Sequence, residues 1–249
     1  MTYCLGILLP SGLVLASDAR SNAGVDQVAR VEKLEIMTVP GERVIAIQSA
    51  GNLATTQAVV TPLFEAAGKG GKTDLHRCKT LFEVAEIVGQ CLRKVVDRDA
   101  HYVEKFGDPN ASFLVSGQIK GEPHRLFEVY SAGNFVEAGS RSPFLQIGET
   151  KYGKPILDRG LTDHTSLDEA AKLALLSFDA TIRSNLSVGL PIDLLRYAKD
   201  SFSPIDRITI EQDNDYWREL RTSYAEGLSA LVASLDPPPS ARGHVLDGT

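Results

Sequence analysis

The sequence predicts an α+β fold, a four-layer αββα sandwich of two antiparallel sheets flanked by helices. Two observations predict it. The segments follow the order strands, two helices, strands, two helices, and Gly- and Pro-containing turns join neighbouring strands. A length of 249 residues is sufficient for four layers. We expect residues 1–235 to form a single domain and the Pro-rich residues 236–249 to form a flexible C-terminal tail.

The first 50 residues read as two β-hairpins. The predicted strands cover residues 3–9, 13–17, 33–39 and 43–50. The beginning of the chain therefore lies inside a sheet, whereas chain termini usually fray. This placement of the amino end requires an explanation.

Apolar residues at helical spacing follow the second hairpin. They predict helices over residues 53–64 and 80–106. Alternating patterns then predict strands at 111–119, 124–131 and 144–147. These strands form a second block of sheet.

The last third of the sequence is predicted to be mainly helical. A Thr165 or Ser166 cap and an acidic first turn predict a helix that ends near Ser184. The remaining segments are expected to be a short helix over 191–198, an edge strand over 206–211 and a closing helix over 216–235.

The composition excludes several classes of partner. A net charge of -6 and a pI near 5.4 argue against a nucleic-acid surface, which needs clustered Lys and Arg. The amino end has no secretion signal, and no apolar run approaches the about 20 residues that cross a bilayer. We therefore expect a cytoplasmic protein without nucleic-acid or membrane partners. The three cysteines and five scattered histidines have no metal-ligand spacing, so no disulfide framework, metal site or cofactor is expected.

Three residues at predicted strand ends form the first candidate site. They are Thr2, Asp18 and Lys33. Strand ends on one side of a set of hairpins gather at one rim, so these side chains can converge. Thr2 would carry its own α-amine as a base once Met1 is removed, and Lys33, held by Asp18, would favour deprotonation. The alternative is an exposed salt bridge beside a hairpin.

Two further segments are candidates with a structural alternative. Gly51 lies where a predicted strand passes into a helix, and its N–H could stabilise a developing oxyanion, or the glycine could simply turn the chain. The hydroxyls of residues 183–189, which include Ser187, follow a predicted helix and could equally cap its end.

Taken together, these residues resemble the amino half of proteasome β subunits and of the bacterial HslV peptidase. The similar segments are residues 2–7 (TYCLGI), 13–20 (LVLASDAR), Lys33 and 49–51 (SAG). The sequence looks still more like Anbu, the bacterial proteasome-related family. That likeness rests on residues 21–26 (SNAGVD), 148–155 (GETKYGKP) and 184–191 (SNLSVGLP).

The resemblance implies an amino-terminal nucleophile hydrolase that assembles with copies of itself and cleaves peptides or unfolded proteins. It implies Thr2 as nucleophile, Asp18 and Lys33 as its charge partners, Gly51 as oxyanion donor and Ser187 as the serine that orders the amine. Ser21 and Leu53 would flank the pocket for a substrate side chain. The resemblance leaves open whether the assembly is a closed ring or an open spiral, and whether an ATPase partner exists.

Two supporting positions depart from the β-subunit pattern. Glu149 stands where a β subunit has serine, and Ser184 stands where it has aspartate. The orientation of the Thr2 amine is therefore expected to differ. Exposure of Thr2 would depend on removal of Met1 by a methionine aminopeptidase.

Two other functions remain open from the sequence. The same nucleophile could act on a small amide or transfer an acyl group, because this class of fold hosts several amidases. The chain could also be a scaffold subunit that keeps Met1 and has no catalytic amine.

Overall fold

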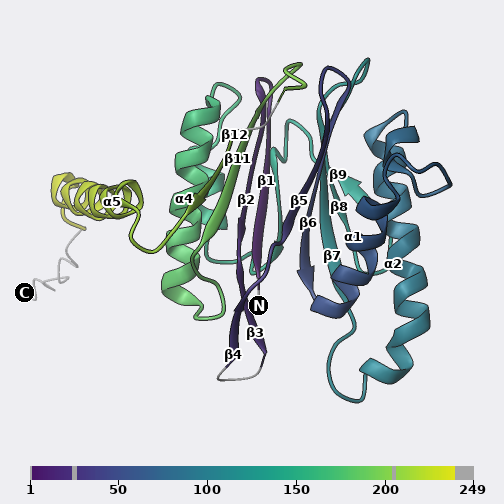
Figure 1. Ribbon diagram of the computed structural model, residues 1–249. Coiled ribbons are helices and arrows are strands. Elements are labelled where there is room, and N and C mark those ends of the chain that lie inside the picture. The colour runs from purple at the N-terminus through teal and green to yellow at the C-terminus, as the bar shows by residue number, and fades with distance from the viewer. Residues whose placement is uncertain (1, 24–26, 204–205, 239–249) are drawn as a thin grey trace, which may run out of the picture.

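Figure 1 shows the computed structural model of the chain, which describes residues 2–23, 27–203 and 206–238. The strands form two five-stranded antiparallel sheets and a separate two-stranded ribbon. The ribbon consists of β3 (Arg20–Ala23) and β4 (Gln27–Arg30), and it extends beyond the lower rim of the sheets in Figure 1. The predicted α+β class and its two antiparallel sheets are confirmed.

The first sheet contains the amino-terminal strand and has the order β10-β1-β2-β11-β12. Its strands are β10 (Phe144–Gly148), β1 (Tyr3–Leu9), β2 (Gly12–Asp18), β11 (Ile192–Ala198) and β12 (Asp206–Ile210). Helix α4 (Leu167–Ser184) lies on the outer side of this sheet (Figure 1), and α3 (Lys154–Gly160) contributes Leu157 to the same apolar cluster. Tyr3, Leu5 and Ile7 pack there against Phe178, because alternate residues of β1 face the helices.

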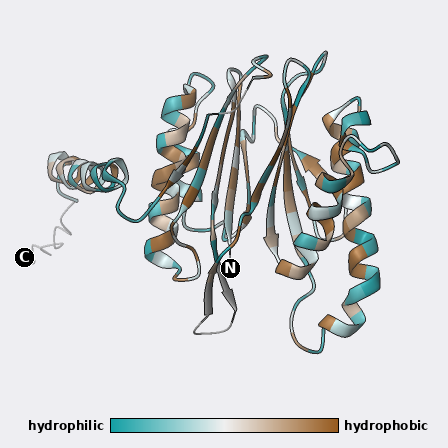
Figure 2. Cartoon of the chain, in the orientation of Figure 1, coloured by the Kyte–Doolittle hydropathy of each residue, from teal (hydrophilic) through white to brown (hydrophobic). Residues whose placement is uncertain are grey.

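The second sheet has the order β5-β6-β7-β8-β9. Its strands are β5 (Leu34–Val39), β6 (Arg43–Gly51), β7 (Ala111–Ile119), β8 (Arg125–Val129) and β9 (Phe135–Glu137). Helices α1 (Leu53–Ala66) and α2 (Leu81–Val103) cover its outer face (Figure 1). In Figure 2 the strands are largely hydrophobic, whereas hydrophobic and hydrophilic residues alternate along the helices, as expected for elements with one buried side.

A third apolar cluster lies between the two sheets. It includes Cys4 and Leu15 of the first sheet together with Leu34, Ala46 and Leu114 of the second. The opposite faces of β1 therefore contribute to different cores. This burial on both faces fixes the strand that follows Thr2.

The prediction of a short helix over residues 191–198 is wrong. Residues 192–198 form β11, which pairs with β2 on one side and β12 on the other. Ile192, Leu194 and Leu195 are all buried, because the strand is covered on both faces. A short apolar run of this kind has no period that distinguishes helix from strand.

The other predicted strands and long helices are present, with ends that differ by a few residues. The strand at 144–147 was expected in the second block of sheet, but it forms β10, which pairs with β1 in the first sheet. Ser166 forms the capping box of α4 with Glu169, as the sequence indicated. The β3–β4 ribbon, β9 and α3 were not predicted.

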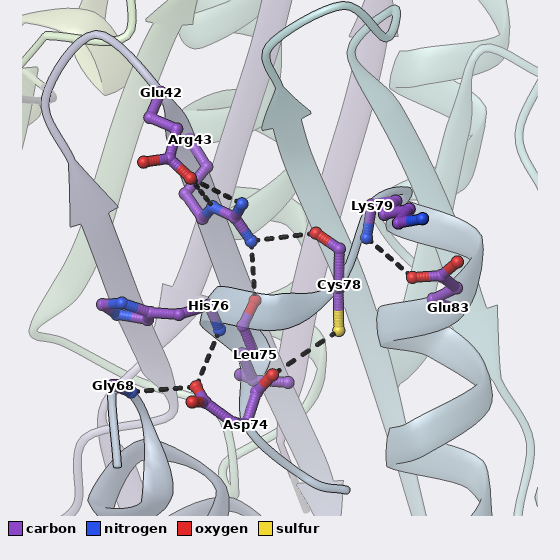
Figure 3. Close-up of polar contacts among 9 residues, drawn as sticks. All are labelled: Glu42, Arg43, Gly68, Asp74, Leu75, His76, Cys78, Lys79 and Glu83. Atoms are coloured by element: carbon purple, nitrogen blue, oxygen red, sulfur yellow. Dashed lines mark hydrogen bonds and ion pairs between the residues drawn. The ribbon is translucent and has the colours of Figure 1, made fainter. Parts of the chain in front are cut away.

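The connection between α1 and α2 is fixed by a polar cluster (Figure 3). The Asp74 carboxylate accepts the backbone N–H groups of Gly68, Gly70 and His76. Arg43 donates to the carbonyls of Leu75 and Cys78 at 2.9 Å, so β6 is tied directly to this loop. The cluster satisfies backbone groups that the loop would otherwise leave unpaired.

The last helix, α5 (Asp215–Ser234), projects away from the sheets in Figure 1. Trp217 is its buried residue. Tyr216 is exposed in its first turn, and further exposed apolar side chains recur at helical spacing toward its carboxyl end, namely Tyr224, Leu228, Leu231, Val232 and, just beyond the helix, Leu235. We call the five residues from Tyr224 to Leu235 the α5 stripe. Within the described residues, no helix is both long enough and apolar enough to span a bilayer.

Candidate active site

Three strand ends meet at the rim from which the β3–β4 ribbon extends. Thr2 directly precedes β1, Asp18 is the last residue of β2, and Lys33 directly precedes β5. The antiparallel pairing of Cys4 with Ser17 brings the start of β1 beside the end of β2. The backbone N–H of Tyr3 donates to Oδ1 of Asp18 at 2.9 Å. The structure thus brings the predicted strand ends together.

Lys33 and Asp18 form a buried ion pair. Nζ of Lys33 lies 2.9 Å from Oδ1 of Asp18, and the side chains are 6% and 0% exposed. Nζ also donates to the backbone carbonyl of Arg20 at 2.5 Å. Oδ1 of Asp18 therefore binds both Lys33 and the peptide that joins Thr2 to Tyr3. The exposed salt bridge that the sequence left open is excluded.

The electrostatics of Asp18 reflect this burial. Desolvation raises the pKa of its carboxyl, while the Lys33 ammonium and the N–H groups of Tyr3 and Arg20 oppose the rise. Oδ2 makes no hydrogen bond within the described residues. An ionised Asp18 consequently depends on Lys33, and the two side chains hold each other in place.

Thr2 is fixed through its backbone. Its carbonyl accepts the N–H of Glu149 at 2.7 Å, at the point where β10 ends. Gly148 has a φ of 83°, and a Cβ at this position would lie 2.0 Å from the Thr2 carbonyl oxygen. A glycine is thus required for β10 to approach Thr2 this closely. The Thr2 side chain is partly exposed and makes no hydrogen bond within the described residues.

Glu149 links Thr2 to the Ser187 segment. Its buried carboxylate accepts the backbone N–H of Lys151 at 3.1 Å and Nδ2 of Asn185 at 3.0 Å. Asn185 in turn accepts the N–H of Ser187 through Oδ1. Ser187 is therefore connected to the rim through Asn185 and Glu149. Ser184 is exposed at the end of α4 and lies outside these contacts.

The role of Glu149 was not predicted from sequence, although its departure from the β-subunit pattern marked the position. The sequence feature that could have indicated this role is a carboxylate directly after Gly148, at the end of a predicted strand. Asn185 gave no comparable signal. Only the fold shows that it bridges Glu149 and Ser187.

Gly51 ends β6 and has a φ of 112°. A Cβ there would lie 2.4 Å from the Asn110 carbonyl oxygen, so the backbone alone requires glycine. Asn52 caps α1 by accepting the N–H groups of Ala54 and Thr55. The presence of Gly51 is thus explained by packing whether or not it also takes part in catalysis.

Leu53 lines a cavity of about 270 Å³ next to Lys33. The walls come from residues 30–32, from Glu35 and Ser49, and from the first turns of α1. The N–H of Ser49 donates to the Lys33 carbonyl at 3.0 Å, so the cavity and the ion pair share this stretch of backbone. Ser21 belongs to β3, but its side chain lies outside the described part of the structure.

The geometry has a clear chemical capacity. The buried carboxylate of Asp18 binds both the Lys33 ammonium and the peptide N–H that follows Thr2, and a cavity lies beside the backbone of Lys33. Such an arrangement suits a hydroxyl nucleophile whose proton must be removed near neutral pH.

Two facing antiparallel sheets with these residues at their rim define a protein related to the proteasome β subunit, and solved structures support this class. Anbu (ancestral beta-subunit) from Yersinia bercovieri is 45% identical, with a TM-score of 0.91 over 96% of this chain and 100% of that one. The chain belongs to the Anbu family. The resemblance inferred from the sequence is thus confirmed.

Two further structures give the same result. An Anbu (Gly-1) mutant from Hyphomicrobium sp. strain MC1 is 44% identical, with a TM-score of 0.89 over 96% of this chain and 100% of that one. A helical assembly of the Anbu complex from Pseudomonas aeruginosa is 43% identical, with a TM-score of 0.91 over 96% and 99%. No protein-family model and no curated protein matches the sequence.

Proposed function

We propose that this chain is a threonine peptidase of the amino-terminal nucleophile hydrolase class, with Thr2 as the nucleophile after removal of Met1. The observation that carries the proposal is the shared oxygen of Asp18. Because Oδ1 binds both Nζ of Lys33 and the N–H of Tyr3, the lysine ammonium is held within two hydrogen bonds of the Thr2–Tyr3 peptide. Membership of the Anbu family supports the same class.

In the proposed first step, the hydroxyl of Thr2 attacks the carbonyl carbon of the scissile peptide bond. Its proton passes to the α-amine of Thr2, whose pKa of about 7.7–8.0 in model compounds suits a proton acceptor in the cell. The positive charge of Lys33 favours loss of the proton, because it stabilises the developing alkoxide. The N–H of Gly51 is the proposed donor to the oxyanion.

In the second step the tetrahedral intermediate collapses to an ester between Thr2 and the acyl part of the substrate. The protonated α-amine gives its proton to the leaving nitrogen, so the amine product departs neutral. A water molecule then attacks the ester with the α-amine again as base, which releases the acid and restores the Thr2 hydroxyl. The path from Ser187 through Asn185 to Glu149 supports the idea that these residues order the amino end.

The proposal includes the architecture and location expected from the sequence. Residues 1–235 would form one αββα domain. The apolar clusters on the outer face of each sheet and between the sheets support these four layers. The active protein would be cytoplasmic, where methionine aminopeptidase can expose Thr2.

We also propose that copies of this chain assemble, and that the α5 stripe is a contact between them. The stripe exposes five large apolar side chains on and just beyond a projecting helix, which is unusual for an isolated monomer. The helical assembly of the Pseudomonas aeruginosa protein, at 43% identity, supports a second copy as the occupant.

The test of the enzymatic proposal begins with the intact mass of purified protein, which should lack Met1. Peptide hydrolysis should then be compared between the wild type and Thr2→Ala. We expect Thr2→Ala to abolish turnover and labelling by a threonine-directed epoxyketone, with an unchanged circular dichroism spectrum. Normal turnover in this variant would refute the proposal. Turnover of small amides without peptides would favour the amidase alternative, and retained Met1 without labelling would favour a scaffold.

A further inference from the structure

The cavity beside Lys33 has an acidic wall. Glu32 and Glu35 line it from one side, and Ser49 and Gln57 contribute polar groups. Arg30 lines it as well. Whether the cavity favours a cationic or an anionic side chain therefore depends on which of these charges already have an ion-pair partner.

The charges other than Glu35 have partners. Glu32 forms an ion pair with Arg207 at 2.7 Å, and Arg30 forms one with Glu211 at 3.0 Å. Glu35 makes no hydrogen bond or ion pair with any described residue. The uncompensated charge in the wall of the cavity is thus negative.

Glu35 lies where the strand pattern calls for an apolar residue. It is on the face of β5 that packs against α1, two residues before the buried Met37 and opposite Ile47 of β6. Burial and the nearby Glu32 raise the pKa of the Glu35 carboxyl, and Arg207 opposes this only in part. A half-buried charge without a partner destabilises the free protein, and a cation in the cavity would relieve that cost.

The amino end of α1 also lies at this cavity and would by itself favour an anion. However, the side chain of Asn52 already accepts the N–H groups of Ala54 and Thr55. The helix end therefore has less capacity left for a substrate carboxylate. Glu35, which has no partner among the described residues, therefore makes the uncompensated charge of the cavity wall negative.

We propose that this cavity takes the side chain of a Lys or Arg residue of the substrate, and that Glu35 is the residue that selects it. The side chain belongs to the residue whose carbonyl Thr2 attacks, so the inference rests on the proposed peptidase function. The hydrogen bond from the Ser49 N–H to the Lys33 carbonyl supports this placement, because Ser49 lines the cavity and Lys33 shares the Asp18 oxygen with the peptide that follows Thr2.

The experiment compares fluorogenic peptides that differ only in the residue before the scissile bond, which is Arg, Lys, Leu or Glu. In the wild-type protein kcat/KM should be highest for Arg and Lys. Glu35→Gln should lower kcat/KM for Arg by about 10- to 100-fold, the loss expected for a charged hydrogen bond, and leave Leu nearly unchanged. Glu35→Lys should reverse the preference toward Glu.

Glu128→Gln is the matched control. Glu128 is a second partly buried glutamate whose pKa is raised by burial, but it lies on β8, three strands from β5. Its substitution should leave the ratio of Arg to Leu unchanged. An equal rate for Arg and Leu in the wild type, or an unchanged ratio in Glu35→Gln, would overturn the inference while leaving the peptidase function intact.

The inference can be judged even if no peptide is cleaved. Product-like peptides that end in Arg, Leu or Glu would be titrated into Thr2→Ala, and their affinity measured by calorimetry. We expect the peptide ending in Arg to bind about 10-fold more tightly than that ending in Leu, and Glu35→Gln in the same background to remove the difference. Equal affinities would overturn the inference. Tighter binding of the peptide ending in Glu would do so too.

Discussion

The Lys33 ammonium lies 2.9 Å from Oδ1 of Asp18 in a site where both side chains are almost fully withdrawn from solvent. A buried ion pair rarely increases net stability, because desolvation of two charges offsets their attraction. Here the pair fixes a charged lysine at the rim where the chain begins. Its geometry therefore serves the candidate active site more than the core.

Lys33→Met should lower the free energy of unfolding by about 3–5 kcal/mol at neutral pH, because it removes the counter-ion of Asp18, whose carboxyl must then be buried unpaired or take up a proton. Burial already raises the pKa of Asp18, and loss of Lys33 removes the largest opposing influence. A carboxyl with a raised folded-state pKa contributes stability at low pH that is lost as the pH rises through that pKa. The loss in Lys33→Met should thus shrink as the pH falls toward 3.8, the ordinary pKa of an aspartate carboxyl.

Urea denaturation of wild type and variant across this pH range measures the effect. Lys154→Met is the control, since it breaks the exposed pair with Asp158 and should cost less than about 1 kcal/mol. Equal losses of unfolding free energy in Lys33→Met and Lys154→Met would contradict a buried ion pair between Lys33 and Asp18.

Gly148→Ala should reduce both the stability of the fold and the labelling of Thr2 far more than an alanine substitution of a glycine with a similar φ elsewhere. The added Cβ would lie 2.0 Å from the Thr2 carbonyl oxygen, so β10 must move away from Thr2. Gly41 has a φ of 73° and, among the described residues, no atom within 4 Å of a Cβ, so Gly41→Ala reports backbone strain alone, about 1–3 kcal/mol. Thermal denaturation and labelling of Thr2 measure both effects, and equal behaviour of the variants would contradict the close contact.

Glu149→Ala should reduce turnover by about tenfold, because its carboxylate holds Asn185, which holds Ser187. Glu149→Gln should recover part of the rate, since the amide oxygen can still accept one of the two hydrogen bonds. Ser184→Ala should behave as wild type, because Ser184 is exposed outside this path. A steady-state comparison of kcat and KM checks the series. A Gln variant no better than Ala would argue against a role through the Asn185 contact.

Leu228→Asp combined with Leu231→Asp should reduce the mass of the assembly, because it places two charges in the α5 stripe. The two leucines are 50% and 57% exposed, so the fold of the single chain should be retained. Light scattering coupled to size exclusion measures the mass. Glu226→Gln, at an exposed polar position of the same helix, is the control. An unchanged mass in the double variant would remove α5 from the proposed contact.

Much of the fold could be predicted from sequence because its signals are local. Ser166 and Glu169 form a capping box within one helical turn, and the apolar residues of β1 alternate within seven positions. Residues 192–198 were misassigned because their partners, β2 and β12, are distant or follow later in the chain. An apolar run becomes a strand or a helix according to what covers it.

The sequence by itself determined which residues lie at the strand ends, because strands and turns can be recognised from short stretches of sequence. These residues are Thr2, Asp18, Lys33 and Gly148. Only the tertiary structure decided that one Asp18 oxygen joins Lys33 to the start of β1, that Glu149 reaches Asn185, and that Glu35 makes no hydrogen bond or ion pair with a described residue. These are contacts between residues far apart along the chain. Their formation depends on the packing of two sheets and not on the pattern of any one segment.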